Sequence, residues 1–135
     1  VLLRQGREAG IIAGPLAASL IDEIPVLSIL GAVSENGITV RDAAELRVKE
    51  TDRIETMAVN LRRMGITIET APDGFTIPGK QSFQAAVVDS CGDHRIAMAC
   101  AVAALRASGE IEIENAEAAS VSFPEFWSTL RYIGS

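Results

Sequence analysis

The sequence predicts a mixed α/β domain in which sheets of short strands cover buried helices. Two runs, residues 24–33 and 96–105, are apolar nearly all round, as expected for helices enclosed by other elements. Short segments of alternating apolar and polar residues follow each run, and this alternation is typical of strands. The segment 36–48 also resembles the segment 108–121, with one inserted residue. Together these observations indicate two copies of a unit that contains two helices and several strands.

The first copy is expected to begin with the buried helix. Proline is tolerated in the first turn of a helix, as Pro25 would be, and Asn36-Gly37 is a break signal after the apolar run. Farther along, apolar residues recur at helical spacing until Gly65, which is a typical helix end. The predicted elements are, in order, a helix at 24–33, a strand at 38–40, a helix at 52–64 and a hairpin of strands 66–69 and 75–78 around the turn 71–74.

The second copy is expected to repeat the same beginning. The apolar run at 96–105 predicts a second buried helix, and Ser108-Gly109 ends it. The alternation in "EIEIEN", residues 110–115, predicts a strand, and residues 123–134 predict a final helix that ends at Gly134.

Composition limits the classes of function. The net charge is −6, which argues against nonspecific binding to nucleic acids or to membrane surfaces. The two cysteines form no disulfide pattern, which favours a reduced, cytoplasmic protein, and the single histidine leaves no Cys/His cluster for a metal. The longest uncharged apolar runs are too short to span a bilayer. The chain is interpreted as a fragment of a longer protein.

Charge of both signs gathers in "ELRVKETDRIETM", residues 45–57, where seven of thirteen residues are charged. Residues 41–63 carry six cations and five anions, whereas residues 64–135 carry four cations and nine anions. A solvated helix face would explain such a segment, and so would a site that holds a charged small molecule.

Two predicted helix starts each present an arginine. Asp93 is a good N-cap for the helix that follows, so Arg95 falls in its first turn. Thr51 or Asp52 is expected to cap the earlier helix, so Arg53 falls in the first turn there. A cation at this position opposes the helix dipole unless a bound anion or a neighbouring carboxylate offsets it. Either arginine alone is explained by such a carboxylate or by solvent, but their recurrence favours two anion sites facing one cleft.

Two carboxylates are candidates for proton transfer. Asp22 precedes the first buried helix, and Glu50 lies between Lys49 and Arg53, whose charges favour its ionised form. Simple alternatives exist for both residues. Asp22 is also a plain N-cap for the helix in the simpler interpretation, and Glu50 forms a salt bridge within its own loop.

The segments "IDEIPVL", "LRVKETDRI", "DHRIAMA" and "SFPEFW" together resemble the carboxy-terminal part of the 5-enolpyruvylshikimate-3-phosphate synthase family, in the family's order and spacing. The resemblance covers the chain from about residue 21 onward. It implies repeated βαβαββ units with buried helices covered by mixed sheets. Residues 1–135 would then be part of one such domain, about two repeat units, without the family's amino-terminal domain.

The resemblance implies the transfer of the carboxyvinyl group of phosphoenolpyruvate to the 5-hydroxyl of shikimate 3-phosphate, without metal or organic cofactor. Asp22 matches the family's base beside that hydroxyl, and Glu50 matches its second proton-transfer carboxylate. Lys49 matches a lysine that contacts shikimate 3-phosphate. Arg53 and Arg95 match the two arginines that hold phosphoenolpyruvate, and the herbicide glyphosate would compete at the same place.

The match has two departures. Val121 stands where some members carry a lysine that contacts phosphoenolpyruvate, and Glu45 stands where some carry an asparagine that contacts shikimate 3-phosphate. These departures indicate a different branch of the family, with glyphosate sensitivity left open. Cys91, beside the second arginine motif, is expected to be a buried and inert thiol.

Two other functions remain open at this stage. The first is transfer of the same group to UDP-N-acetylglucosamine, catalysed by a sibling enzyme of the same fold, although "DHR" and "KETDR" favour the shikimate enzyme. The second is a non-catalytic anion-binding domain. Because the amino-terminal domain would supply the rest of the site, the 135-residue chain alone is expected to be inactive, and the complete protein is expected to be a cytoplasmic monomer.

Overall fold

The chain alternates strands and helices in a repeated order. The computed structural model describes residues 10–134, and within this range the side chains of residues 121, 122 and 131–134 are not described. The elements, in order, are β1 (Gly10–Ile12), α1 (Gly14–Ser19), a 3-10 turn (Ile21–Glu23), α2 (Ile24–Val33), β2 (Ile38–Val40), a 3-10 turn (Ala44–Val48), α3 (Arg53–Arg63), β3 (Glu69–Ala71), β4 (Gly74–Ile77), β5 (Ala86–Asp89), α4 (His94–Ala104), β6 (Ile111–Glu114), α5 (Ala118–Ser122) and α6 (Phe126–Gly134).

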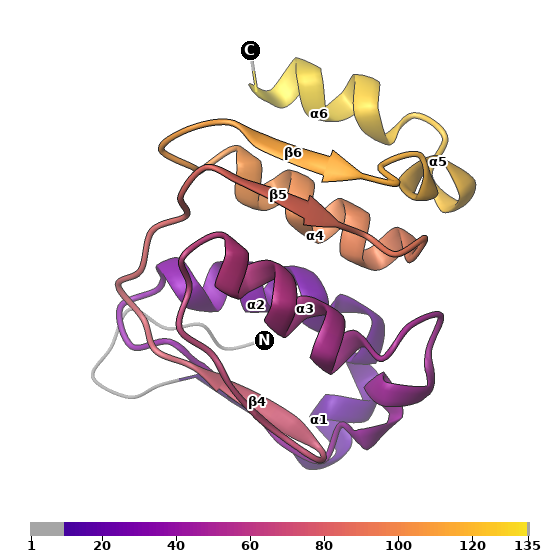
Figure 1. Cartoon of the computed structure of the whole chain (residues 1–135). Helices are drawn as coiled ribbons and strands as arrows, with labels where there is room; N and C mark the ends of the chain where they lie inside the picture. Colours follow the sequence, from indigo (N-terminus) through magenta and orange to yellow (C-terminus); the bar gives the residue numbers. More distant parts are fainter. Residues whose placement is uncertain (1–9, 135) are drawn as a thin grey trace.

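Two separate sheets cover the helices. The first has the strand order β1-β2-β4-β3, in which β1 and β2 are parallel and the other neighbours are antiparallel. The second consists of β5 and β6, which are parallel. In Figure 1 the first sheet lies below α2 and α3, and the β5–β6 pair lies above them together with α4. The predicted class, a mixed α/β fold with buried helices, is therefore confirmed.

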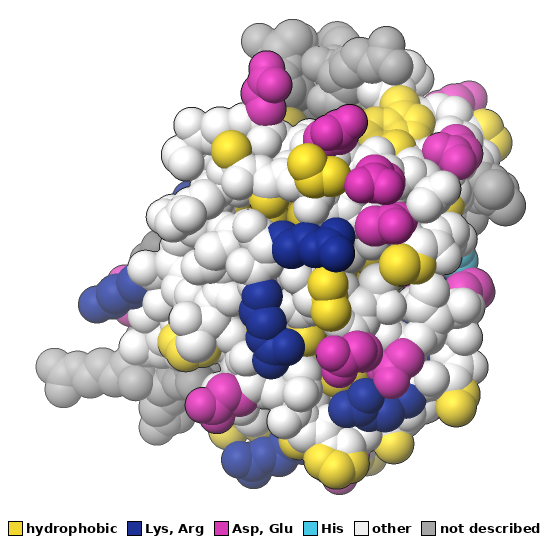
Figure 2. Space-filling view, viewed as in Figure 1, with side chains coloured by type: hydrophobic (Ala, Val, Ile, Leu, Met, Phe, Trp, Pro, Cys, Tyr) yellow, Lys and Arg dark blue, Asp and Glu magenta, His cyan; other side chains and the backbone are white. Residues whose placement is uncertain are grey.

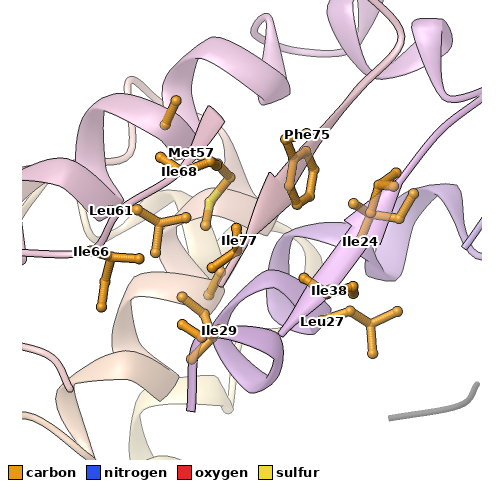
Figure 3. Packing of buried hydrophobic residues seen from close by; sticks show 14 of the residues in the cluster. Ile24, Leu27, Ile29, Ile38, Met57, Leu61, Ile66, Ile68, Phe75 and Ile77 are labelled. Atoms are coloured by element: carbon orange, nitrogen blue, oxygen red, sulfur yellow. The ribbon is translucent and has the colours of Figure 1, made fainter. Parts of the chain in front are cut away.

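The helix α2 is buried because almost none of its side chains is polar. Seven of its ten residues are buried, including Ile24 and Ile29, which are 1% exposed. Figure 3 shows Ile29 and Leu27 of α2 near Ile38 of β2 and Ile77 of β4, in the core that α3 closes from the other side. Each such aliphatic side chain contributes roughly 1.5–3 kcal/mol when it is fully buried.

The helix α4 packs against α2 through small side chains. Its buried positions are mainly alanines, including Ala99 and Ala103, which are 0% exposed, and Ala32 of α2 is likewise 0% exposed. Small residues let two helix axes approach closely, so both helices can lie in the interior at once. A second, smaller apolar cluster joins α4 to α5 and α6 through Ala119 and Phe126.

Most of the predicted elements are present, but several bounds differ, and the strands β1 and β5 and the short helices α1 and α5 were not predicted. The predicted strand 66–69 begins only at Glu69, and the hairpin partner is Gly74–Ile77. The final helix begins at Phe126 rather than at residue 123, and the short helix α5 before it was not predicted. None of the helices formed by residues 10–134 has the length and apolar character that a membrane crossing requires.

Candidate functional site

The candidate site lies where α3 and α4 begin. Both helices start on the same side of the molecule, at the right in Figure 1, and the histidine in this region, His94, is visible at the right margin of Figure 2. The predicted residues Asp22, Lys49, Glu50 and Arg53 come together there, and Arg95 lies in the first turn of α4.

Local contacts fix the start of α3. Asp52 is the N-cap residue, and its carboxylate accepts a hydrogen bond from the backbone N–H of Glu55 at 3.1 Å. The other carboxylate oxygen lies 2.9 Å from Arg47, which also donates to the carbonyl oxygens of Ala71 and Pro72 in the hairpin. The loop that carries Lys49 and Glu50 is therefore tied to the first sheet.

The side chain of Arg53 is almost completely buried, at 2% exposed, and it contacts three carboxylates. Its Nε and one terminal nitrogen donate to the two oxygens of Asp93, at 2.9 and 3.2 Å. The other terminal nitrogen donates to Asp22 at 3.1 Å, and a further hydrogen bond reaches Glu50. Burial alone would lower the pKa of Arg53, but the hydrogen bonds and charges of Asp93, Glu50 and Asp22 outweigh it and raise that pKa. Arg53 therefore remains charged.

Asp93 is 0% exposed and serves as the N-cap residue of α4. Its carboxylate accepts hydrogen bonds from the backbone N–H of Arg95 at 3.0 Å and from the hydroxyl of Thr51 at 2.9 Å, in addition to the two from Arg53. Burial would raise the pKa of Asp93, but the hydrogen bonds from Arg53 and Thr51 outweigh it and lower that pKa. The Arg53–Asp93 pair is thus ionised and connects the starts of both helices.

The loop before Asp93 is rigidly held. The hydroxyl of Ser90, a buried residue, donates to the carbonyl oxygen of Asn115 at 2.8 Å and accepts from the N–H of Gly92 at 3.1 Å. Gly92 has φ +79°, a conformation that favours glycine because it has no Cβ. The "CGD" turn therefore places Asp93 at a defined point of α4.

Asp22 and Lys49 form the more exposed side of the cluster. Lys49 Nζ lies 3.7 Å from Asp22 Oδ1, and the Asp22 side chain is 46% exposed. Asp22 does not cap α2 with its side chain, so the simple capping alternative is not observed. Lys49 is also 3.3 Å from Glu45, the residue that departs from the asparagine of some family members.

Glu50 adopts the alternative arrangement in part. It pairs with Arg53 three residues later, which is a salt bridge close in sequence, and its side chain is 52% exposed. The same pairing directs its carboxylate toward the cluster that contains Asp22. The salt bridge within its own loop is therefore observed, and proton transfer by Glu50 stays a prediction.

Arg95 has weaker partners than Arg53. Its side chain is 35% exposed, and its terminal nitrogen lies 3.8 Å from Glu23. The Nε atom is buried without a hydrogen-bond partner among the described residues. Arg95 and Asp22 also line an open, largely apolar pocket of about 260 Å³, together with Met98 and Phe123. An anion that reaches this pocket would therefore meet the guanidinium of Arg95, which is incompletely paired.

A bound cation at this place is disfavoured by the donor set. Oxygen or nitrogen atoms of Glu50, Asp93 and His94 lie within 4.8 Å of one another, as metal ligands would. However, both oxygens of Asp93 and one of Glu50 already accept hydrogen bonds from Arg53. The guanidinium therefore takes the position of a cation in this cluster.

Sequence reasoning missed two features of this region. It treated Asp93 only as a cap, whereas this carboxylate is fully buried and paired with Arg53. No local sequence signal indicates a contact between segments so far apart. It also predicted a buried thiol at Cys91, which is wrong, because Cys91 is exposed at a backbone φ of +53°. Partial burial and the charge of Asp89 raise the pKa of that thiol, so it stays protonated at neutral pH. The side chain of Val121, the other departure, lies outside the described side chains.

The site thus belongs to an α/β domain in which the helices α3 and α4 each carry an arginine in the first turn, beside one of two separate sheets. The family model described as EPSP synthase (3-phosphoshikimate 1-carboxyvinyltransferase) matches residues 12–130, and the chain belongs to this family.

Relatives agree with this assignment. The chain is 66% identical over 126 residues to the 3-phosphoshikimate 1-carboxyvinyltransferase of Solibacter usitatus, covering 93% of this chain and 30% of that protein. It is 52% identical to the protein of the same name from Koribacter versatilis, and the match covers 90% of this chain and 29% of that protein. A solved structure of EPSP synthase from Acinetobacter baumannii superposes with a TM-score of 0.84 at 39% identity, over 93% of this chain and 30% of that one. The chain thus spans about a third of the length of these relatives.

Proposed function

We propose that the chain is the carboxy-terminal, substrate-binding part of a 3-phosphoshikimate 1-carboxyvinyltransferase. The complete protein would transfer the carboxyvinyl group of phosphoenolpyruvate to the 5-hydroxyl of shikimate 3-phosphate and release inorganic phosphate. The observation that carries the proposal is the charge cluster around Arg53, in which a buried guanidinium joins Asp22, Glu50 and Asp93 beside Lys49.

The cations of the cluster suit the anionic substrates. We assign Arg53 and Arg95 to phosphoenolpyruvate. Arg53 is held in place by its hydrogen bonds to Asp93, and Arg95 has a buried Nε without a hydrogen-bond partner among the described residues. We assign Lys49 to the ring hydroxyls of shikimate 3-phosphate and to the reacting centre, since it lies beside Asp22. Fixed cations of this kind stabilise the charge that develops in an addition step.

The two partly exposed carboxylates suit the two proton transfers. In the addition, the oxygen of the 5-hydroxyl bonds to C2 of phosphoenolpyruvate and Asp22 takes the hydroxyl proton. Glu50 delivers to C3 a proton that it has first taken up from solvent. In the elimination, Glu50 removes a proton from C3, the bond between C2 and the phosphate oxygen breaks, and phosphate leaves. Asp22 and Glu50 then release their protons to solvent. No metal or organic cofactor takes part in these steps.

The rest of the active site would come from the part of the protein outside this chain. We assign the remaining contacts to shikimate 3-phosphate to an amino-terminal domain, since the relatives are about three times as long as the chain. The complete protein would be a cytoplasmic monomer without nucleic-acid or membrane partners. The net charge of −6 on the 135-residue chain favours this absence of nucleic-acid and membrane partners.

The test is phosphate release from phosphoenolpyruvate by the complete protein with each of two acceptors. Release with shikimate 3-phosphate and not with UDP-N-acetylglucosamine is the expected result. Release only with the sugar nucleotide would move the protein to the sibling reaction, and release with neither would indicate an anion-binding protein without this activity.

A further inference from the structure

Asp93 is bound far more extensively than a helix cap requires. An N-cap carboxylate needs one hydrogen bond from the backbone and can remain in water. Asp52 behaves in this way at the start of α3, where its side chain is 37% exposed. Asp93 occupies the matching place on α4, yet it is 0% exposed and accepts four hydrogen bonds.

The contacts of Asp93 hold the guanidinium of Arg53 from its buried side. They involve Nε and one terminal nitrogen, so the plane of the group is fixed by two parallel hydrogen bonds. The remaining N–H groups face Asp22 and Glu50, whose side chains are 46% and 52% exposed. An incoming anion can therefore reach Arg53 only from the side that Asp93 leaves open.

The same carboxylate also sets the start of α4. It accepts the backbone N–H of Arg95, so the first turn of that helix is anchored to the group that holds Arg53. Arg53 and Arg95 lie 42 residues apart in the sequence and on different halves of the fold. Among the described residues, Asp93 is the acceptor that both of them contact, since Glu23 reaches only Arg95 and Asp22 and Glu50 reach only Arg53.

We propose that Asp93 is a positioning residue that fixes Arg53 and the helix start of Arg95 relative to each other, so that both arginines meet one anion together. This inference rests on the proposed function, in which that anion is phosphoenolpyruvate. Asp93 does not contact the substrate and acts through the two arginines. The negative charge of Asp93 by itself would repel an anion. Removing that charge therefore tests whether the repulsion or the positioning of the two arginines has the larger effect on anion binding.

The first variant is Asp93→Asn in the complete protein. Asparagine has nearly the same size and can still cap α4 through its amide oxygen, but it loses the charge and one acceptor oxygen for Arg53. The expected result is a KM for phosphoenolpyruvate that rises about tenfold, while the KM for shikimate 3-phosphate changes less than about twofold. An unchanged or lower KM for phosphoenolpyruvate would overturn the proposal.

The matched control is Asp52→Asn. It makes the same chemical change at the equivalent cap of α3, and Asp52 contacts Arg47 but neither Arg53 nor Arg95 through its side chain. Both KM values are expected to stay within about twofold of the unmodified protein. A rise in the KM for phosphoenolpyruvate equal to that of Asp93→Asn would mean that weakening either cap suffices, which would overturn a specific role for Asp93.

A double-variant cycle separates positioning from general damage. If Asp93 acts through Arg53, then Asp93→Asn should add less than about twofold to the KM of an Arg53→Lys variant, because lysine has already lost the two parallel hydrogen bonds. Independent, multiplying effects would overturn the proposal. An Arg53→Lys variant with an unchanged KM for phosphoenolpyruvate would instead contradict the assignment of Arg53 in the proposed function, so the two failures can be distinguished.

A milder variant keeps the proposal testable if Asp93→Asn does not fold. Thr51→Val removes the hydroxyl that donates to Asp93 at 2.9 Å and preserves the shape of the side chain. It should loosen Asp93 and raise the KM for phosphoenolpyruvate about threefold, with little change in the KM for shikimate 3-phosphate. A folded Thr51→Val protein with an unaltered KM for phosphoenolpyruvate would overturn the proposal.

Discussion

The two arginines differ in how they are held, and this difference leads to a prediction at the scale of single residues. Among the described residues, the side chain of Arg95 has one distant partner, Glu23 at 3.8 Å, which is half exposed, so truncating Arg95 leaves this carboxylate in contact with water. Arg95→Ala in the complete protein is expected to raise the KM for phosphoenolpyruvate about ten- to a hundredfold, because a hydrogen bond to a charged group contributes about 1.5–3 kcal/mol. The KM for shikimate 3-phosphate should change much less.

Steady-state kinetics with each substrate varied in turn would check this prediction. The control is Arg106→Ala, which removes an exposed arginine just beyond the other end of α4 and should leave both KM values unchanged. Equal increases in both KM values for Arg95→Ala would mean that Arg95 does not belong to the phosphoenolpyruvate site.

The ion pair between Arg53 and Asp93 predicts a pH dependence of stability. The pKa of Asp93 is lowered from its ordinary value of 3.8 in the folded protein, so protons bind more readily to the unfolded chain. The contribution of this carboxylate is therefore fully present above about pH 4 and is lost as the pH falls through the lowered pKa. The difference in unfolding free energy between the unmodified protein and Asp93→Asn should shrink below about pH 4.

Denaturant unfolding at pH values between 7 and 2 would measure that difference. A difference that stays constant over this range would show that the carboxylate does not titrate differently in the folded and unfolded states. The lowered pKa of Asp93 would then be wrong.

At the scale of elements, the helices were predicted more accurately than the strands. An all-round apolar run such as residues 24–33 has few stable arrangements other than a buried helix, and α2 has these bounds. The strand predicted at 66–69 starts later because the backbone of Thr67 pairs with the side-chain amide of Gln81, in both directions, rather than with another strand. Alternation alone cannot reveal such a side-chain partner.

The short helix α5 was missed for a related reason. Its residues are small and nearly uniform, so they carry neither a strong apolar stripe nor an alternation.

The residues of the candidate site could be chosen from helix-start chemistry and from family motifs. The buried contact of Arg53 with Asp93, 40 residues away, depends on how the two halves pack, and local patterns do not contain that information.

The close packing of α2 predicts the effect of enlarging a glycine. Gly31 of α2 and Ile38 of β2 are both buried, and a Cβ added to Gly31 would overlap the side chain of Ile38. Alanine favours the helix by about 1 kcal/mol, whereas overpacking a core costs about 1–3 kcal/mol, so Gly31→Ala should be neutral to destabilising by about 2 kcal/mol. Val59→Ala on the exposed side of α3 is a suitable control, expected within about 0.5 kcal/mol.

Thermal or denaturant unfolding of both variants would measure these changes. A Gly31→Ala protein that is more stable by about 1 kcal/mol, the full gain in helix propensity, would show that α2 and β2 can separate without cost.

At the scale of the whole molecule, the candidate site is open on one side. Asp22 and Glu50 are about half exposed, and the pocket beside Asp22 and Arg95 has apolar walls that include Phe123, which is 41% exposed. Phosphoryl and carboxylate groups are held strongly only where water is excluded and several donors converge. The 135-residue chain presents its share of these donors, and its relatives are about three times as long.

The isolated chain is therefore expected to bind phosphoenolpyruvate weakly and to release no phosphate, even with both substrates present. The complete protein should release phosphate under the same conditions, because domain closure would assemble the remaining contacts and exclude water. Measuring phosphate release by equal concentrations of the two proteins tests this, with circular dichroism to establish that the short chain is folded. Turnover by the folded 135-residue chain would mean that its own residues suffice for the reaction, and the assignment of essential shikimate 3-phosphate contacts to another domain would be wrong.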